Sequence, residues 1–474
     1  MNEQKNSGFW DRAIRNLRGV WSRIGSDEDE FTEIVLSPEL DDGDRDRLLK
    51  HMQACLDDRG GEVSARTRAA ALGHAYLGLN EEGRKRFLQV MATEFDTDHE
   101  AVDAAVKELQ SATDPVARQN AEQSLKKSLE AARVRLLTQF NALPEGVKFL
   151  VDLRADLTQW VKDDPVLQSV ETDLKALLSS WFDVGFLELK QITWDAPAAL
   201  LEKLFAYEAV HEIKSWDDLK NRLASDRRCF AFFHPRMPEE PLIFVWVALT
   251  EGISTNIQEL LDEDAPIVDV TDADSAIFYS ISSAQQGLSG INFGNFLIKR
   301  VVDSLSGELR GLKRYSTLSP IPGFCRWLKS ALDDERTLEF LSDEQRSALT
   351  GLAMKDTAAE AIRHLLFEAG WYGNAEKSEA LQEPLLKLAA RYICVEKWGG
   401  GTALDSVAHF HLNNGARVEQ INWEADTSSK GLQQSAGLMV NYRYLLEDID
   451  GNHESYRSGQ EVSTSNKVKS LLKV

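Results

Sequence analysis

The sequence predicts an α+β protein of two domains, in which an all-α helical bundle precedes a mixed α/β domain. From about residue 37 to residue 182, apolar residues recur every three or four positions, which is the spacing of amphipathic helices. After residue 185, runs of β-forming residues such as LIFVWVALT at 242–250 alternate with helical segments. We therefore expect an N-terminal domain at 1–185 and a C-terminal domain at 186–474.

The helical half contains clear helix starts. Asp114-Pro115 and Asp164-Pro165 each combine an N-cap carboxylate with a proline that suits the first helical turn. Pro144 similarly opens a segment with an apolar stripe. Helices of this kind need a partner surface, so we expect them to pack on one another and to offer a surface for self-association.

The C-terminal half alternates between the two kinds of element. We expect strands at 228–235, 242–250, 276–282, 312–318 and 416–425. Helices are expected at 254–262, 296–306, 323–335, 343–370 and 378–395. The polar tail after Asp448 is expected to be partly loose.

Composition limits the possible partners. Lys plus Arg number 54 and Asp plus Glu number 76, so the formal net charge is −22, which argues against a protein that coats nucleic acid. An acidic protein can still bind an anionic ligand through a local cluster of cations. The candidates for such a cluster are Lys299, Arg300, Lys313 and Arg314.

The sequence also bears on location. No apolar run reaches the roughly 20 residues that a membrane span needs. The four cysteines show neither C-x-x-C spacing nor a disulfide framework, so we expect no metal site and a reducing compartment. Residues 9–24 are amphipathic and Arg-rich, which leaves open an organelle presequence or a simple N-terminal helix. Because Glu3 and Asp11 favour the simple helix, we expect a cytoplasmic protein.

A glutamine- and glycine-rich loop is the first candidate for ligand binding. The strand pattern up to Ile281 stops at Gln285-Gln286-Gly287, glycines follow at 290 and 294, and a helix begins near Phe296. Backbone N–H groups of such a loop and of a helix N-terminus can hold a phosphate. The order strand, loop, helix, strand and serine-proline turn is the layout of an acyl-coenzyme A site, although spacing alone leaves open that the glycines only make a tight turn.

Two side chains beyond this loop could carry chemistry. Ser319 stands in LSPIPG, where two prolines restrict the backbone, although a turn serine is the alternative. His411 lies in a short helix expected to open at Asp405 or Ser406, although a packed histidine is the alternative. His409 and His411 are two positions apart, so they face opposite ways and do not form a metal pair.

Other polar residues are weaker candidates. Glu208 and His211 are three positions apart and could share a hydrogen bond. His234, Arg227 and Arg228 lie near a strand and could meet an anionic ligand, or they could end the strand at a solvated edge. The sequence contains no G-x-S-x-G, H-E-x-x-H or kinase pattern.

Several segments together resemble the malonyl-CoA decarboxylase family, and the resemblance spans about 180 to 450. The segments are RRCFAFFHP (227–235), AIFYSISSAQQGLSGINFGNFLIKRVV (276–302), LSPIPGF (318–324), HFHLNNGA (409–416), INWEAD (421–426) and GLMVNYRYLLE (437–447). This similarity implies a helical N-terminal domain used in oligomerisation and a C-terminal domain of the acetyltransferase-like (GNAT-type) fold that binds acyl-CoA. It also implies the conversion of malonyl-CoA to acetyl-CoA and carbon dioxide.

The resemblance assigns roles to residues of this sequence. The family's catalytic serine corresponds to Ser319 and its catalytic histidine to His411. The family's coenzyme A loop corresponds to Ser289, Gly290, Ile291, Asn292, Phe293, Gly294 and Asn295. Asn292 departs from relatives that carry glutamate, which puts a carboxylate role in the loop in doubt. Homodimer and homotetramer both stay open. The same resemblance would also suit a mitochondrial matrix enzyme beside the expected cytoplasmic one.

The implied chemistry suits these residue types. Loss of carbon dioxide leaves a thioester enolate, so the substrate is its own electron sink and we expect no cofactor. His411 would protonate the α-carbon, and Ser319 would orient the malonyl carboxylate or the histidine. The alternatives are a GNAT-type acyltransferase that uses an acyl-CoA donor and a non-catalytic acyl-CoA sensor.

Overall fold

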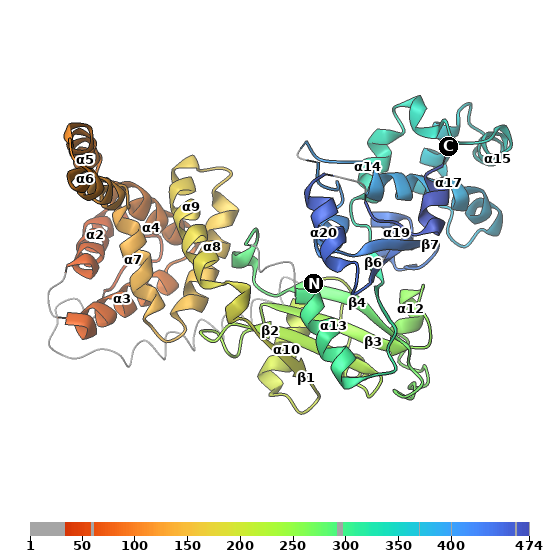
Figure 1. Ribbon diagram of the computed structural model, residues 1–474, viewed down its shortest axis with the longest axis horizontal. Helices are drawn as coiled ribbons and strands as arrows, with labels where there is room; N and C mark the ends of the chain where they lie inside the picture. Colours follow the sequence, from red (N-terminus) through yellow and green to blue (C-terminus); the bar gives the residue numbers. More distant parts are fainter. Residues whose placement is uncertain are drawn as a thin grey trace. The chain divides into compact units, whose positions relative to one another are not determined.

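The computed structural model describes residues 34–57, 61–291, 297–368, 370–399, 401–459 and 462–473 (Figure 1). The chain forms two compact units. The helical unit comprises Met1–Glu188 together with Phe233–Leu242 and Ala284–Phe293. The sheet unit comprises Leu189–Phe232, Ile243–Ser283 and Gly294–Val474. The N-terminal segment 9–24 lies outside the described residues, and the oligomerisation role of residues 1–185 stays a prediction.

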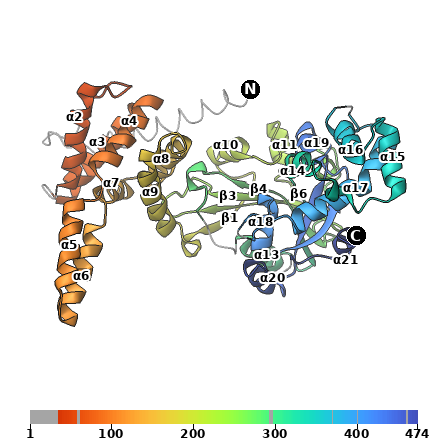
Figure 2. The same ribbon diagram turned by 90° about the horizontal axis from the view of Figure 1, so that it is seen from above.

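The helical unit confirms the predicted run of helices. Its helices are α2 (Asp42–Leu56), α3 (Gly61–Gly78), α4 (Glu81–Glu94), α5 (His99–Ser111), α6 (Pro115–Ser128), α7 (Ala132–Asn141), α8 (Gly146–Trp160) and α9 (Gln168–Trp181). The predicted caps form, since Asp114 accepts two backbone N–H bonds at the start of α6 and Asp164 caps the short 3-10 turn before α9. Helices α5 and α6 lie side by side (Figure 2).

Helix α8 is the central element of the helical unit. Nine of its 15 residues are buried, so it is buried on more than one side, unlike a surface helix with one apolar stripe. Its Phe149 packs against Phe140 of α7 and Tyr76 of α3, with ring centroids 4.9 and 5.6 Å apart. The buried residues of α8 also include Arg154.

The sheet unit is built on one mixed sheet. Its strands are β1 (Glu188–Ile192), β2 (Arg227–Phe233), β3 (Ile243–Thr250), β4 (Ser275–Ser283), β5 (Arg314–Thr317), β6 (Ser319–Pro320), β7 (Arg417–Asn422) and β8 (Met439–Tyr444). The strand order is β1-β2-β3-β4-β5-β8-β6, with β7 also beside β8. The five predicted strands are confirmed, whereas β1, β6 and β8 were not predicted.

Helices complete the sheet unit. They are α10 (Ala198–Tyr207), α11 (Trp216–Asn221), α12 (Ile257–Leu260), α13 (Leu297–Glu308), α14 (Phe324–Ala331), α15 (Asp343–Ala353), α16 (Ala358–Phe367), α17 (Ala375–Cys394), α18 (Ser406–Asn413), α19 (Ser429–Ser435), α20 (Ile449–Arg457) and α21 (Asn466–Leu471). None of the helices within the described ranges has the length and apolar character to span a membrane.

One helix prediction and the prediction for the C-terminal tail need correction. The single helix expected at 343–370 is two helices, because Met354 adopts a left-handed conformation with φ 51° and Thr357 caps the second helix. The expectation of a loose tail after Asp448 was wrong, because α20 and α21 bury Ile449 and Val468. Buried apolar side chains at those positions give the polar tail its packing energy.

The sheet opens in its middle. Strands β4 and β5 run parallel and are connected through α13, and their pairing ends at Phe278 and Thr317. Beyond that point β4 continues beside β3 to Ser283, whereas Ser319 pairs with Val440 of β8. Because the two strands diverge after Phe278 and Thr317, side chains from both sides can line a space between them.

Candidate active site

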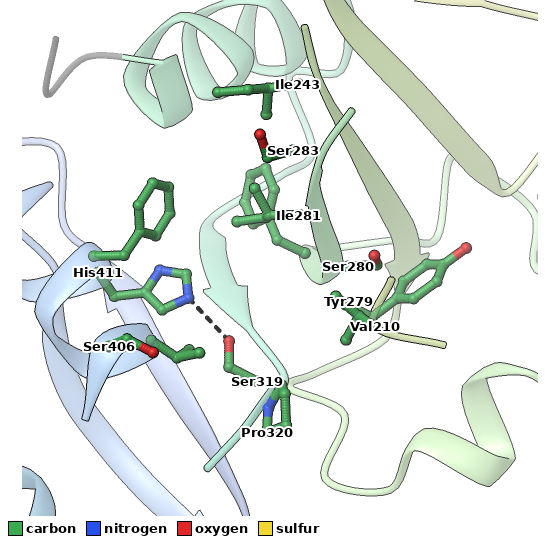
Figure 3. Close-up of a pocket in the computed structure, with 13 residues that line it drawn as sticks. Val210, Ile243, Tyr279, Ser280, Ile281, Ser283, Ser319, Pro320, Ser406 and His411 are labelled. Atoms are coloured by element: carbon green, nitrogen blue, oxygen red, sulfur yellow. Dashed lines mark hydrogen bonds between the residues drawn. The ribbon is translucent and has the colours of Figure 1, made fainter. Parts of the chain in front are cut away.

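The opening between β4 and β6 holds a cavity of about 240 Å³. Residues of β4, β6 and α18 line it, as Figure 3 shows. The lining residues are Val210, Ile243, Phe278, Tyr279, Ser280, Ile281, Ser283, Ser319, Pro320, Ser406, Val407, Phe410 and His411. Among these described residues there is no lysine, arginine, aspartate or glutamate. The pocket is therefore apolar, with a few hydroxyl groups and one imidazole.

The structure brings together the two predicted catalytic residues. Ser319 Oγ lies 3.0 Å from Nε2 of His411 (Figure 3). Ser319 Oγ also donates to Thr317 Oγ1 at 2.9 Å. The serine is only 6% exposed because its strand is paired with β8. A side chain on a paired strand has a fixed direction, so the hydroxyl is held rather than free to rotate with a turn.

Helix α18 positions His411. The helix begins as predicted, because the Asp405 carboxylate accepts the backbone N–H groups of Val407 and Ala408. The His411 ring is 2% exposed and stacks on Tyr442, with ring centroids 4.6 Å apart and an interplanar angle of 24°. Its Nδ1 lies 2.9 Å from the hydroxyl of Tyr444. Both ring nitrogens therefore have hydroxyl partners.

Burial determines the charge of this histidine. Desolvation lowers the pKa of His411 to about 3, and burial raises the pKa of Tyr444. The imidazole is therefore neutral and the phenol keeps its proton at neutral pH. Since Ser319 donates its only proton to Thr317, its oxygen accepts from Nε2–H, and Nδ1 accepts from Tyr444. With the Ser319 proton on Thr317, these contacts fit the tautomer of the neutral ring that carries its proton on Nε2.

The neighbouring histidine faces away, as predicted. His409 is only partly buried, and its Nδ1 lies 2.8 Å from the hydroxyl of Tyr456 on α20. His409 does not line the pocket that contains His411. The two histidines of α18 therefore occupy different environments, which agrees with a spacing of two residues on a helix.

Glu208 is an anchor rather than a partner of the His211 ring. Its Oε1 accepts the backbone N–H groups of Val210 and His211 at 2.8 and 2.9 Å. The same carboxylate accepts from Trp246 Nε1 and Ser280 Oγ, at 2.9 and 2.8 Å. The shared side-chain hydrogen bond that the spacing suggested is therefore replaced by backbone contacts, and Glu208 ties the segment after α10 to β3 and β4.

The predicted cationic candidates are mostly engaged elsewhere. Lys299 lies 3.3 Å from Asp450, and Arg314 lies 2.7 Å from Asp274. Arg300 lies over the ring of Phe232, 5.4 Å from its centroid. These three side chains therefore serve ion pairs and packing, and none of them lines the pocket.

The weaker candidates near β2 have structural partners. Arg227 and Arg228 form ion pairs with Asp226 and Glu308, at 2.8 and 2.6 Å. Nε2 of His234 lies 3.1 Å from the carbonyl oxygen of Trp181, within the helical unit. The Arg227 and Arg228 side chains are only 9% and 12% exposed and β2 lies between β1 and β3, so the alternative of a solvated strand edge is wrong and these residues are structural.

The predicted coenzyme A loop is described in part. A short 3-10 turn, η3 (Gln286–Leu288), precedes Ser289, Gly290 and Ile291, and this segment belongs to the helical unit. Ser289 and Gly290 are exposed, and Gly290 has φ 72°, which favours glycine. Asn292, Phe293, Gly294 and Asn295 lie outside the described residues. Binding by this loop therefore stays a prediction.

Sequence reasoning missed Thr317, Tyr442 and Tyr444. The signal was present in MVNYRY, since alternate residues of a strand share a face and the two tyrosines are two positions apart. Without the strand prediction for 439–444, nothing connected these tyrosines with a histidine more than 30 residues earlier. Long-range pairing of β7 with β8 brings them together.

The chain is similar to known proteins over most of its length. Family models described as the malonyl-CoA decarboxylase N-terminal and C-terminal domains match residues 95–182 and 185–474. The mitochondrial malonyl-CoA decarboxylase of Mus musculus is 40% identical over 436 residues, which is 87% of this chain and 87% of the mouse protein. Crystal structures of malonyl-CoA decarboxylases from Rhodopseudomonas palustris and Agrobacterium vitis are 38% and 40% identical, each with a TM-score of 0.81. The matches cover 90% of this chain and 99% and 100% of those chains. The chain belongs to the malonyl-CoA decarboxylase family.

Proposed function

We propose that the protein decarboxylates malonyl-CoA to acetyl-CoA and carbon dioxide. The observation that carries this proposal is the Ser319–His411 pair at 3.0 Å in a pocket whose described lining has no charged side chain. Family membership and the names of the relatives support the same reaction.

The reaction needs an acceptor for one electron pair and a donor of one proton. When the bond between the α-carbon and the carboxylate breaks, its electron pair moves into the thioester and forms an enolate. The thioester carbonyl is therefore the electron sink, and the proposal includes no cofactor. Because no cation is among the described residues that line the pocket, the carboxylate is poorly stabilised there and its loss is favoured.

The roles of Ser319 and His411 follow from their protonation states. Ser319 orients the malonyl carboxylate by turning its O–H from Thr317 to the substrate, or it orients the imidazole of His411. His411 is neutral while carbon dioxide leaves. The negative charge of the enolate then raises the pKa of the imidazole, which takes up a solvent proton and delivers it to the α-carbon. One proton is consumed in each turnover. General acid catalysis of this kind contributes roughly 10²–10⁴-fold in rate.

The finer structural predictions belong to the same proposal. The parallel β4–β5 pair connected through α13 supports an acetyltransferase-like (GNAT-type) sheet domain that binds acyl-CoA. Backbone N–H groups of the loop that begins at Ser289 bind coenzyme A, each donor to the thioester oxygen contributing about 3 kcal/mol in the transition state. We further propose a homo-oligomer that self-associates through the helical domain, and a cytoplasmic enzyme of fatty acid metabolism.

One incubation separates this function from its rivals. Metal-stripped protein is mixed with malonyl-CoA alone, and carbon dioxide and acetyl-CoA are measured. Stoichiometric release of both products supports the decarboxylase. An intact substrate that is consumed only after addition of an amine acceptor would instead identify an acyltransferase. Tight binding without any turnover would identify an acyl-CoA sensor.

A further inference from the structure

The segment that follows β4 is built on the helical unit. Ala284–Phe293 clusters with the helices rather than with the sheet. Gly287 lies directly against α8, since a Cβ atom there would stand 1.7 Å from the carbonyl oxygen of Val151. Gln285 Nε2 donates to the carbonyl oxygen of Pro241 at 2.9 Å, within the same unit. Any side chain at 287 would push the segment off the helix.

A buried arginine fixes this segment. Arg154 of α8 is 2% exposed, and its Nη1 donates to the carbonyl oxygens of Gly287 and Ser289 at 2.6 and 2.9 Å. Its Nε and Nη2 donate to Oε1 of Glu171 on α9, at 3.2 and 2.7 Å. The guanidinium therefore uses its planar donors to tie two helices to two carbonyl groups of the loop.

A lysine lies beside the exposed part of the same segment. A Cβ atom built at Gly290 would stand 3.4 Å from Nζ of Lys175. Lys175 follows Glu171 by four residues on α9, so the two side chains share one face of the helix. No carboxylate among the described residues forms an ion pair with Lys175. This contrasts with Lys299 and Arg314, which have carboxylate partners.

We propose that the helical unit carries a binding site for a phosphate group of coenzyme A. Lys175 binds a phosphate group of coenzyme A at Gly290, and Arg154, held by Glu171, is a positioning residue that keeps the Gly287–Ser289 backbone in place. The inference rests on the proposed function only for the identity of the ligand. The geometry that carries it lies entirely within the helical unit. The helical domain would then have a binding role beside self-association.

Coenzyme A and pantetheine test the role of Lys175, because pantetheine lacks the phosphates. In calorimetry on the full chain, Lys175→Gln should weaken coenzyme A binding about tenfold, which corresponds to about 1.4 kcal/mol, and leave pantetheine binding unchanged. Lys162→Gln is the matched control, since it removes one exposed lysine of the same unit. Equal weakening by both variants, or no effect of Lys175→Gln, would overturn the phosphate role.

Arg154 is tested against a second buried arginine of the helical unit. Arg133 is 4% exposed and lies 2.7 Å from both Asp96 and Asp173, away from the loop. Arg154→Ala should raise KM for malonyl-CoA about tenfold or more with kcat within about threefold. Arg154→Lys should recover part of that loss, because lysine keeps the positive charge. Recovery should be incomplete, because one ammonium group cannot reproduce the planar N–H donors of a guanidinium.

The control and the outcomes separate a positioning role from a folding role. Arg133→Ala should lower Tm at least as much as Arg154→Ala while leaving KM unchanged. Equal KM changes in the two alanine variants would refute the positioning role. If Arg154→Ala does not fold, the KM of Arg154→Lys still tests the positioning role, and the Lys175 titrations still test the phosphate role. If wild type binds coenzyme A but does not decarboxylate malonyl-CoA, the proposed function fails while the calorimetric results stand.

Discussion

The pocket at Ser319 and the loop segment at Gly290 differ in charge. Apolar side chains, hydroxyl groups and a neutral imidazole line the pocket, whereas Arg154 and Lys175 lie against the loop segment. Decarboxylation removes the charge of the carboxylate. A cation beside the carboxylate would therefore stabilise the bound substrate more than the transition state. The phosphates of coenzyme A keep their charge throughout, so a cation there improves binding equally in ground and transition states. The two regions therefore suit two separate tasks, reaction and retention.

The largest effect is expected from removal of the two side chains that we propose to act in the pocket. His411→Ala and Ser319→Ala should each lower kcat by roughly 10²–10⁴-fold, because proton delivery and carboxylate orientation are lost. Affinity for coenzyme A should stay within a few-fold, since the loop segment is untouched. The assay is product release under saturating malonyl-CoA, beside calorimetry with coenzyme A.

His409→Ala is the matched control for that experiment. It removes a histidine of the same helix whose ring contacts Tyr456 outside the pocket. Its kcat should remain within about threefold of wild type, because it takes no part in proton transfer. A similar loss in His409→Ala and His411→Ala would mean that α18 folding, not chemistry, was measured.

Adding a cation to the pocket should separate binding from reaction. Ser283 lies at the end of β4, lines the pocket and is exposed enough to accept a longer side chain. Ser283→Lys should lower KM for malonyl-CoA and lower kcat about tenfold, the pattern of lost ground-state destabilisation. Ser283→Met has a similar length without charge and should not lower KM. An unchanged or higher kcat in Ser283→Lys would contradict the argument from an uncharged pocket.

The phenol of Tyr444 should contribute less than the residues it supports. Tyr444→Phe removes the hydroxyl at Nδ1 of His411 and with it the preference for a proton on Nε2. One such hydrogen bond is worth about 1 kcal/mol, so kcat should fall about tenfold or less with KM unchanged. Tyr442→Phe keeps the ring that stacks on His411 and should behave as wild type. Equal losses in the two variants would assign the effect to packing.

Local signals predicted much of the fold and long-range pairing accounts for the rest. The caps at Asp114 and Asp405 were predictable because each side chain bonds its own helix. Ser319 and His411 were nominated individually, but their 3.0 Å contact depends on β6 pairing with β8 and on the position of α18. Arg154 could not be predicted as a loop anchor, because its partners Gly287 and Ser289 lie more than 130 residues away.

The burial of polar residues could not be predicted from local sequence. Strand β8 and the tail helices carry polar residues that a periodicity argument assigns to solvent, such as Asn441, which is fully buried and bonded to Thr317. A buried amide is tolerated only when it is hydrogen-bonded. Whether the partner exists depends on the sheet order, which no local window contains.

The smallest expected effect is that of pH on the wild-type enzyme. The ordinary pKa of histidine is about 6.5, and burial lowers that of His411 to about 3. A lowered pKa means that the free enzyme holds a neutral imidazole throughout pH 5–8, so kcat/KM should change by less than about threefold over that range. Initial rates at low malonyl-CoA concentration, in buffers of constant ionic strength, measure this directly. A bend near pH 6.5 would show that burial does not lower the pKa of His411 in the free enzyme, and the contrast between an uncharged pocket and a charged loop would then lose its electrostatic basis.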